Sequence, residues 1–287
     1  MLASENRFRE ITEKLTQIPT LPTVVTKITL LMQNPRTSAS EVGQAITTDQ
    51  SLTTKTLKLV NSAFYGFPGR INTITHAIVI LGFSTVKNIV LTASILDSLG
   101  GKKNKAALQF DVEAFWKHSV GSGAIAKVLA DTLLPGSREE AFIAGLLHDL
   151  GKVVLSTFAS EDYKAVLDYR DRENVLLREA ERKVLGFTHS EVGLWLAEKW
   201  SLPRDLRAVV EYHHNPGLAN PYEKLTSIVH LADILSRALG ANGGDDCIPQ
   251  ISDYVWEKLH LESMNWPDLL KKCEIEIDKA SVFLEEL

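Results

Sequence analysis

Apolar residues recur at intervals of three and four along almost the whole chain, which is the spacing of one face of an α-helix. Phe8, Ile11, Leu15 and Ile18 form the first such stripe. No segment alternates strictly between apolar and polar residues, and no two candidate strands flank a hairpin turn. The pattern therefore predicts an all-α protein.

Helix start and stop signals divide the first hundred residues into about six short helices. Ser38 and Glu41 have the spacing of a capping box, and Asp49 is suited to cap the helix that follows it. Gly82 is expected to end one helix shortly before another begins. We assign these helices to a first, N-terminal helical lobe, residues 1–100.

A polar, glycine-containing segment at residues 100–104 interrupts the pattern and predicts a flexible join. Beyond it we expect a second helical lobe over residues 101–240 and a C-terminal helical tail over residues 241–287. The fold class predicted is an all-α, two-lobed helical bundle whose lobes share one interface. Helices in the second lobe are predicted at about 111–131, 138–150, 160–171, 174–185, 189–200, 204–214 and 222–239.

Composition narrows the class of protein. The chain has 287 residues and a formal net charge of −5, whereas a domain that neutralises phosphate backbones is usually basic, so we expect no nucleic-acid partner. The longest apolar run, residues 77–81, is far below the roughly 20 residues of a membrane helix, so we expect no membrane contact. Cys247 and Cys273 lack metal or redox spacing. With charges where a signal peptide would be apolar, these features predict a soluble, cytoplasmic protein.

The dipeptide His148-Asp149 stands between two apolar segments, AFIAGLL at 141–147 and VVL at 153–155. An ionised carboxylate in such surroundings is unfavourable unless a metal ion or a hydrogen-bond donor compensates it. The dipeptide alone leaves two alternatives open. It holds a metal, or Asp149 caps or pairs locally while His148 is a hydrogen-bonded core residue.

Two further histidines occupy apolar helix faces. His118 has Phe115 one turn before it and lies on the apolar side of its predicted helix. Thr188 and Glu191 have capping-box spacing, which places His189 in the first turn of the next helix. A single inward histidine is usually a satisfied core residue, so neither is decisive alone.

The paired histidines and one more carboxylate complete the set. His213 continues an apolar stripe, and His214 stands about 100° around the helix from it, so the pair reaches two neighbouring ions more easily than one. Asp233 follows Val229 by one turn, and the alternative for Asp233 is a surface ion pair with Arg237.

Together, five imidazoles and two carboxylates lie on apolar faces of five predicted helices. Mixed nitrogen and oxygen ligands suit a pair of borderline divalent ions such as iron, manganese, zinc or cobalt. Five independent accidents are less plausible than one site. The candidate metal ligands are His118, His148, Asp149, His189, His213, His214 and Asp233.

This order of residues resembles the HD superfamily of metal-dependent phosphohydrolases, and it is similar to the dinuclear branch that contains the HD-GYP phosphodiesterases. The string HDLGK at 148–152 matches that branch's HD-x-G-K element. The resemblance implies two divalent ions, iron or manganese favoured and zinc, cobalt or nickel as alternatives. It implies that Asp149 bridges them and that Asp149 and Lys152 are the catalytic residues, with Lys152 meeting a substrate phosphate. The alternative for Lys152 is a cation at a helix C-terminus.

The resemblance also implies how the ligands divide and where this chain departs from its relatives. Residues 215–217 read Asn-Pro-Gly after the paired histidines instead of Gly-Tyr-Pro, which argues against cyclic di-GMP hydrolysis. Ala114 stands where some trinuclear relatives carry Glu, which implies two ions rather than three. One coordination sphere would be completed by His118, His148 and Asp233, and the other would be supplied by His189, His213 and His214.

The first lobe narrows the resemblance to the HDOD family, the HD-related output domains of bacterial signalling proteins. The likeness runs from about residue 12 to residue 240. Asp49 and Asn61 belong to the matching motifs, but we expect them to cap and to end helices rather than to take part in chemistry. The motifs are Leu21-Pro22, Asp49 with Leu52, Asn61-Ser62-Ala63 before Tyr65-Gly66, and THAIVILG at 75–82.

Three alternative functions follow from the resemblance. The first is a signalling module with a dinuclear metal site that acts on a partner protein in trans or on a phosphorylated small ligand. The second is an active metal-dependent phosphohydrolase of a nucleotide or another phosphoester. The third is a metal-free protein-interaction scaffold. Many HDOD domains lack the full ligand set, so membership alone does not imply catalysis, but this chain retains the set. The sequence leaves the oligomeric state open.

Overall fold

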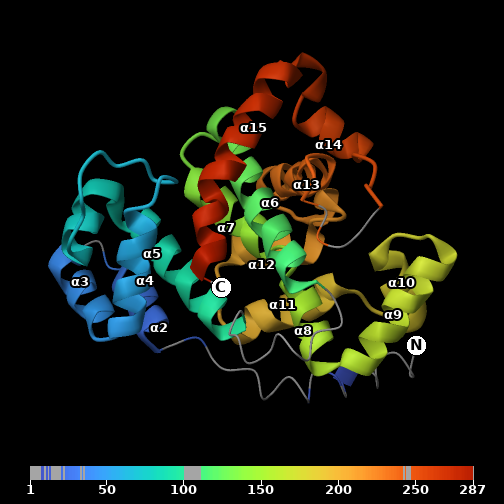
Figure 1. Ribbon diagram of the computed structural model, residues 1–287, viewed down its shortest axis with the longest axis horizontal. Coiled ribbons are helices and arrows are strands. Elements are labelled where there is room, and N and C mark those ends of the chain that lie inside the picture. Colours follow the sequence, from blue (N-terminus) through green and yellow to red (C-terminus); the bar gives the residue numbers. More distant parts are fainter. Residues whose placement is uncertain are drawn as a thin grey trace. The chain divides into compact units, whose positions relative to one another are not determined.

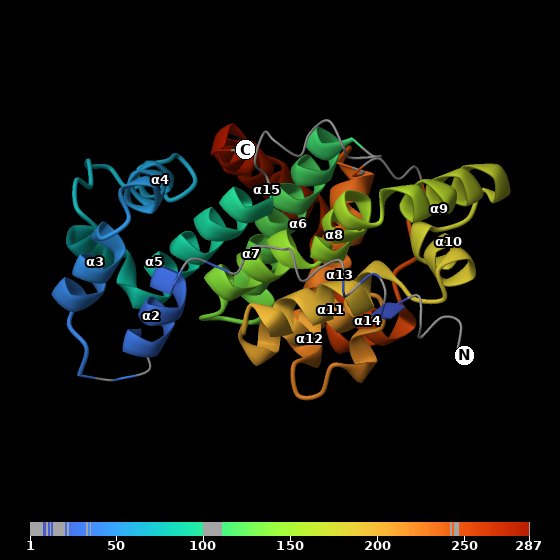
Figure 2. The same ribbon diagram turned by 90° about the horizontal axis from the view of Figure 1, so that it is seen from below.

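The structure is a computed structural model, and it describes residues 8, 9, 11, 13, 21, 23–32, 34, 36–99, 111–241, 243 and 247–286. Its regular elements are helices, and no strand occurs among the described residues, which confirms the all-α prediction (Figures 1 and 2). The predicted join at 100–104 lies outside the described residues, as do Leu15 and Ile18 of the first predicted helix.

The chain divides into two compact units. The smaller unit comprises Pro19–Lys102 and Asp278–Leu287, and the larger unit comprises Met1–Ile18 and Lys103–Ile277. The predicted division into two lobes and a C-terminal tail stays a prediction. The two compact units differ from it at both ends of the chain: residues 1–18 group with the larger unit, and the predicted tail is divided between the two units.

The helices of the smaller unit begin and end largely where local signals predict. The Ser38 capping box is present, because the Glu41 backbone N–H donates to the Ser38 hydroxyl and the Glu41 carboxylate accepts from the Ser38 N–H. The Asp49 carboxylate caps the next helix by accepting from the Leu52 N–H at 2.9 Å. The elements are α2 (Thr23–Met32), α3 (Ala39–Thr47), α4 (Gln50–Val60), α5 (Ile74–Leu99) and the short 3-10 helix η4 (Ser281–Glu286).

Helix α5 is two helical segments joined at Gly82, as predicted. Gly82 has φ 85° and ψ 164°, which interrupts the helical backbone at that residue. Asn61 ends α4, and its side-chain amide bonds to the carbonyl oxygens of Leu57 and Ile71 and to the N–H of Ile71. The structural roles expected for Asp49 and Asn61 are therefore observed.

All seven helices predicted for the second lobe are present, and an eighth was missed. The predicted helix 138–150 ends at Leu147, and a separate helix starts at Leu150, so the His148-Asp149 dyad lies at the junction. The elements of the larger unit are α6 (Val112–Leu133), α7 (Arg138–Leu147), α8 (Leu150–Phe158), α9 (Ser160–Glu173), α10 (Leu177–Val184), α11 (His189–Lys199), α12 (Arg204–Tyr212), η2 (Pro216–Leu218), α13 (Glu223–Ala238), α14 (Asp253–Lys258), η3 (Leu261–Ser263) and α15 (Trp266–Ala280). Helix α15 continues beyond Ile277, the last residue of the larger unit.

The packing of the larger unit brings distant segments of the chain together. Helices α6 and α7 lie side by side, and α13 packs against both (Figure 1). Helix α11 packs between α8 and α12, while α9 pairs with α10 (Figure 2). The helices that carry the predicted ligands are thus neighbours around one core.

Within the described residues, two stretches are long and apolar enough to cross a membrane by length and composition alone. They are Ile74–Ser98 and Arg138–Phe158, and 56% and 89% of their most apolar windows are buried inside the protein. The second stretch contains the His148-Asp149 junction and forms part of the core of the larger unit. The absence of a membrane partner stays a prediction.

Candidate metal centre

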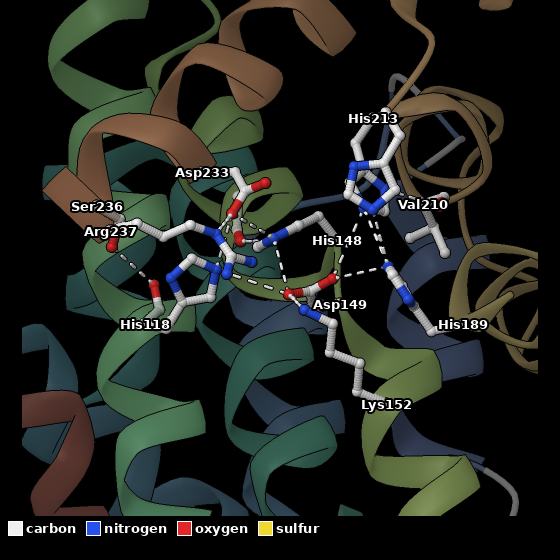
Figure 3. Close-up of polar contacts among 12 residues, drawn as sticks. His118, His148, Asp149, Lys152, His189, Val210, His213, Asp233, Ser236 and Arg237 are labelled. Atoms are coloured by element: carbon white, nitrogen blue, oxygen red, sulfur yellow. Dashed lines mark hydrogen bonds and ion pairs between the residues drawn. The ribbon is translucent and has the colours of Figure 1, made fainter. Parts of the chain in front are cut away.

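All seven predicted ligands lie together in the core of the larger unit. They come from α6, the α7–α8 junction, the start of α11, the residues after α12, and α13 (Figure 3). Six of the seven are buried and His214 is half-buried. Side chains that are more than 80 residues apart in sequence therefore converge on one point.

The dyad is held in place by a close approach of two backbones. His148 ends α7 and Asp149 precedes the first residue of α8. A Cβ atom at Gly151 would lie 1.9 Å from the carbonyl oxygen of His189, so only glycine lets the start of α8 meet the start of α11. This approach sets Asp149 against His189, and it gives the glycine of the HDLGK string its physical role.

The two carboxylate oxygens of Asp149 face different groups of histidines. Oδ2 lies 3.2 Å from Nε2 of His148 and 3.6 Å from Nε2 of His118. Oδ1 lies 3.2 Å from Nε2 of His189 and 3.6 Å from Nε2 of His213. Asp149 is therefore placed to bridge two ligand groups.

Each group is compact enough for one ion. Nε2 of His118 lies 3.0 Å from Oδ1 of Asp233, and Nε2 of His214 lies 3.1 Å from Nε2 of both His213 and His189. We call these the Asp233 group and the His214 group. Each offers ligand atoms within 4.8 Å of one another: His118, His148 and Asp233 in the first, and His189, His213 and His214 in the second.

Both paired histidines belong to the His214 group. Helix α12 ends at Tyr212, with His213 as its C-cap. The expectation that the pair reaches two ions stays a prediction. His213 also forms a possible ligand trio with His148 and Asp149, which places it nearest the bridging carboxylate.

Hydrogen bonds fix the orientation of the imidazole rings. Nδ1 of His118 lies 2.8 Å from the carbonyl oxygen of Ala241, and Nδ1 of His148 lies 2.6 Å from that of Gly145. Nδ1 of His213 is likewise 3.0 Å from a carbonyl oxygen, that of Val210. A carbonyl oxygen only accepts, so Nδ1 carries a proton and each Nε2 is directed into the centre.

These atoms fit a metal centre because they face one another and lack hydrogen-bond partners. Among the described residues, Nε2 of His118, Nε2 of His148 and Oδ1 of Asp149 are buried without a hydrogen-bond partner. Buried polar atoms without partners are costly, and lone pairs that converge at 3.1 to 3.5 Å repel unless a cation or a proton lies among them. Imidazole nitrogen with carboxylate oxygen is a donor set for first-row divalent ions.

The charges of Asp149, His213 and His214 agree with this fit. Burial alone would raise the pKa of Asp149, but His148 and Lys152 hold it well below its usual range. Burial lowers the pKa of His213 and of His214 well below the usual range, so both are neutral, as ligands must be. His148 differs, because the carboxylates of Asp149 and Asp233 outweigh the effect of burial and raise its pKa to about 9. His148 is therefore protonated at neutral pH without an ion, and a metal ion would have to displace that proton.

Two buried cations flank the Asp233 group. Nζ of Lys152 lies 2.6 Å from Oδ2 of Asp149, and Nε of Arg237 lies 2.8 Å from Oδ1 of Asp233. The Asp233–Arg237 pair is buried and does not lie at the surface, which corrects that alternative. Lys152 stands in the first turn of α8, so the alternative of a cation at a helix C-terminus is wrong as well. Its contact with a phosphate stays a prediction.

Two residues of the centre were missed by the sequence analysis. Glu181 of α10 is fully buried, and its Oε2 accepts from both the N–H and the Nδ1–H of His189. His230 of α13 is buried with Nδ1 at 2.8 Å from the carbonyl oxygen of His213, while its Nε2 accepts from the Ser252 N–H. Both nitrogens of His230 are thus occupied, so it supports His213 instead of acting as a ligand.

The fold and the centre define a class: an all-helical domain with a buried candidate metal centre built around a His-Asp dyad. The model of the HDOD domain family matches residues 18–216, and the chain belongs to this family. The finer likeness to the HD-GYP ligand set stays a prediction.

Comparisons with individual proteins agree with the fold and with the assignment to the HDOD family. An uncharacterised protein of Treponema pallidum (strain Nichols) is 27% identical over 245 residues, covering 84% of this chain, which spans about half (46%) of the length of that curated relative. An HDOD domain protein of unknown function from Geobacter sulfurreducens is 27% identical with a TM-score of 0.73, and the match covers 97% of both chains. A protein from Shewanella amazonensis SB2B, provisionally described as a phosphohydrolase, shares the fold at 22% identity and a TM-score of 0.74, covering 96% of this chain and 97% of the other.

Proposed function

We propose that this HDOD domain is a signal-transduction module that holds two divalent metal ions and recognises a phosphorylated small ligand beside them. Its output would pass to a signalling partner in trans. The observation that carries the proposal is the arrangement of Asp149, whose two oxygens face two separate groups of buried ligand atoms. Asp149 would bridge the ions, with the Asp233 group and the His214 group completing their spheres. Iron or manganese are favoured, and zinc, cobalt and nickel suit the same donors.

The balance of buried charge supports an anionic ligand. The centre contains three buried carboxylates, those of Asp149, Glu181 and Asp233. The two buried cations Lys152 and Arg237, with the proton that His148 holds in the metal-free protein, balance them. Two divalent ions would give the centre a clear excess of positive charge, even after displacing that proton. A phosphate group is the anion that paired divalent ions in proteins commonly bind, because their charge stabilises its oxygens.

A pocket provides access to the centre. Among the predicted ligands, His214 alone is not fully buried, and it lines a pocket of about 670 Å³ beside α10, α11 and the end of α12. Arg178 and Lys183 of α10 and Tyr212 also line this pocket. A phosphorylated molecule of moderate size would fit there with its phosphate directed toward His214.

Hydrolysis of a phosphoester is the second candidate function. It is favoured by Lys152, whose ammonium group lies beside the bridging carboxylate, where it would hold Asp149 ionised and in place. When bound, the ions would supply an activated water and stabilise charge on the leaving oxygen. The description of the Shewanella neighbour points the same way, although at that identity the likeness concerns the fold.

The proposal is tested by metal analysis followed by ligand binding. Protein purified without chelator from metal-supplemented cells should contain close to two ions per chain, and it should bind inorganic phosphate in a calorimetric titration. Removing the metal should abolish phosphate binding. Fewer than about 0.2 ions per chain would contradict the proposal and favour the scaffold. Turnover of a phosphoester panel by the loaded protein would favour the second candidate.

A further inference from the structure

Glu181 contacts the centre through one histidine only. Its Oε2 lies 2.6 Å from Nδ1 of His189 and 2.9 Å from the backbone nitrogen of the same residue. No predicted ligand role falls to Glu181, because its carboxylate reaches the far side of the imidazole and not Nε2. It therefore acts on the centre through His189.

The partner of His189 differs in charge from those of the other oriented ligands. Nδ1 of His118, His148 and His213 each bonds to a backbone carbonyl oxygen, which is neutral. A carboxylate partner makes the imidazole more electron-rich and binds its proton more tightly, so Nε2 of His189 is the strongest of these four donors toward a cation.

The carboxylates near the two groups have different partners. Arg237 pairs with Asp233, and Lys152 pairs with the oxygen of Asp149 that faces the Asp233 group. The carboxylate of Glu181 stands behind the His214 group, and no ion pair of the described residues joins Glu181 to a lysine or an arginine. A divalent ion in the His214 group would therefore meet the charge of Glu181, whereas two fixed cations offset the carboxylate charges beside the Asp233 group.

The burial of the Glu181 carboxylate is energetically unfavourable. It is fully buried, and its Oε1 has no hydrogen-bond partner. An ionised carboxylate in a protein core is retained when a nearby positive charge compensates it, and His189 at the edge of a metal centre offers that compensation.

We propose that Glu181 is a positioning residue that orients and strengthens His189, and that it makes the His214 group the higher-affinity position of the two. The inference rests on the proposed metal centre, and it adds an order of filling: the His214 group binds its ion first and loses it last. Glu181 would be worth about 10-fold to 100-fold in affinity at that position, the range seen for partners of ligating histidines.

Cobalt(II) is the probe that tests this assignment, because its visible absorption reports ligand number directly and needs no catalytic activity. Metal-free protein is titrated with cobalt in competition with a chelator of known affinity. Wild-type protein should show two binding events of unequal affinity. Glu181→Gln keeps the size of the side chain and an acceptor for His189 but removes the charge, so the tighter event should weaken about 10-fold to 100-fold while the weaker stays unchanged.

Glu191→Gln is the matched control. Glu191 lies on the same helix as His189 and caps it through Thr188, so the variant removes a nearby charge without contact with the centre. Both cobalt affinities should equal those of the wild type. His189→Ala identifies the position, because it should remove the tighter event.

The outcomes separate this inference from the proposed function. A wild-type protein that binds no cobalt overturns the metal centre itself. Two cobalt events that stay unchanged in a folded Glu181→Gln variant, as judged by circular dichroism, leave the centre intact and overturn the role of Glu181. Should that variant fail to fold, His189→Ala decides, since loss of the weaker event instead of the tighter one contradicts the proposed order.

Discussion

The two units of this protein are both helical, yet they bury different kinds of polar side chain. In the described part of the smaller unit, the buried polar residues are neutral: Thr56, Ser62, Asn88, Thr92 and Ser94. In the described part of the larger unit, eleven buried side chains are imidazoles, carboxylates or cations, and all of them except Lys127 lie at the centre. Those at the centre are His118, His148, Asp149, Lys152, Glu181, His189, His213, His230, Asp233 and Arg237.

The difference shows under which conditions a helical core tolerates buried polar groups, which are costly to bury. A buried hydroxyl can be satisfied within its own helix, as when Ser94 donates to the carbonyl oxygen of Val90 at 2.8 Å. A buried charge needs partners from other helices, and even then its desolvation costs several kcal/mol. Such a cluster is understandable where a bound cation repays that cost, so we place the chemistry in the larger unit.

The largest expected effect comes from removing the bridge. Asp149→Ala should abolish binding of both ions, because Asp149 alone faces both groups, whereas His189→Ala should mainly weaken one position. Metal content measured by elemental analysis checks the order. Exposed His260→Ala and core Leu59→Ala, in the smaller unit, are the controls and should keep the wild-type metal content, although Leu59→Ala should cost about 2–5 kcal/mol of stability. Equal metal content in the Asp149 and His260 variants would refute the assignment.

Metal removal should destabilise the larger unit in particular. An ion that binds only the folded state stabilises it by about 2.7 kcal/mol when its free concentration is a hundredfold above its dissociation constant. Chelation should therefore lower the melting temperature at neutral pH. Hydrogen exchange should accelerate in α6, α11 and α13, which carry ligands, more than in α3 and α4. An unchanged melting temperature after complete metal removal would speak for the scaffold.

Two glycines should respond differently to the same substitution. Gly151→Ala forces a Cβ against the His189 backbone, so it should cost about 3 kcal/mol and lower metal content as well. Gly82→Ala meets no atom within 4 Å and strains only its own φ of 85°, so it should cost about 1 kcal/mol and leave the metal in place. Thermal melts and metal analysis of both variants measure these losses. Equal losses of stability and of metal content in the two variants would contradict the special role of Gly151.

The smallest expected effect is a dependence of the stability of the metal-free protein on pH. The pKa of His148 is raised from 6.5 to about 9 because Asp149 and Asp233 outweigh the effect of burial. A raised pKa means that the folded state holds the proton more tightly, so this stabilisation is complete below pH 6.5 and is lost as the pH rises to about 9. Melting temperatures of chelated protein should fall across this window, and less so in His148→Gln. If the melting temperature of the His148→Gln variant falls by the same amount, the pH dependence comes from another titratable group.

Much of the fold could be predicted because its signals are local. The Ser38 and Thr188 capping boxes, the Asp49 cap and the Gly82 break depend on a few adjacent residues. The seven candidate ligands could be proposed because an ionisable residue on an apolar helix face is visible in the sequence, and the structure brings their side chains together, while their binding of metal stays a prediction. The HDOD resemblance is confirmed by the family match.

What could not be predicted depends on contacts between helices. Glu181 lies on the stripe formed by Leu177, Ala180 and Val184, the same signal that revealed the histidines, but its charged neighbours concealed it. Helix α8 was missed because the predicted helix ended at residue 150 and the short apolar segment after it was assigned to no helix.

If Asp149 bridges two metal ions, both should be visible by anomalous diffraction from crystals of protein purified without chelator. We expect two peaks, one bounded by Asp149, His118, His148 and Asp233, and the other by Asp149, His189, His213 and His214. A single peak, a peak that does not contact Asp149, or none at all after metal-supplemented growth would contradict the claim.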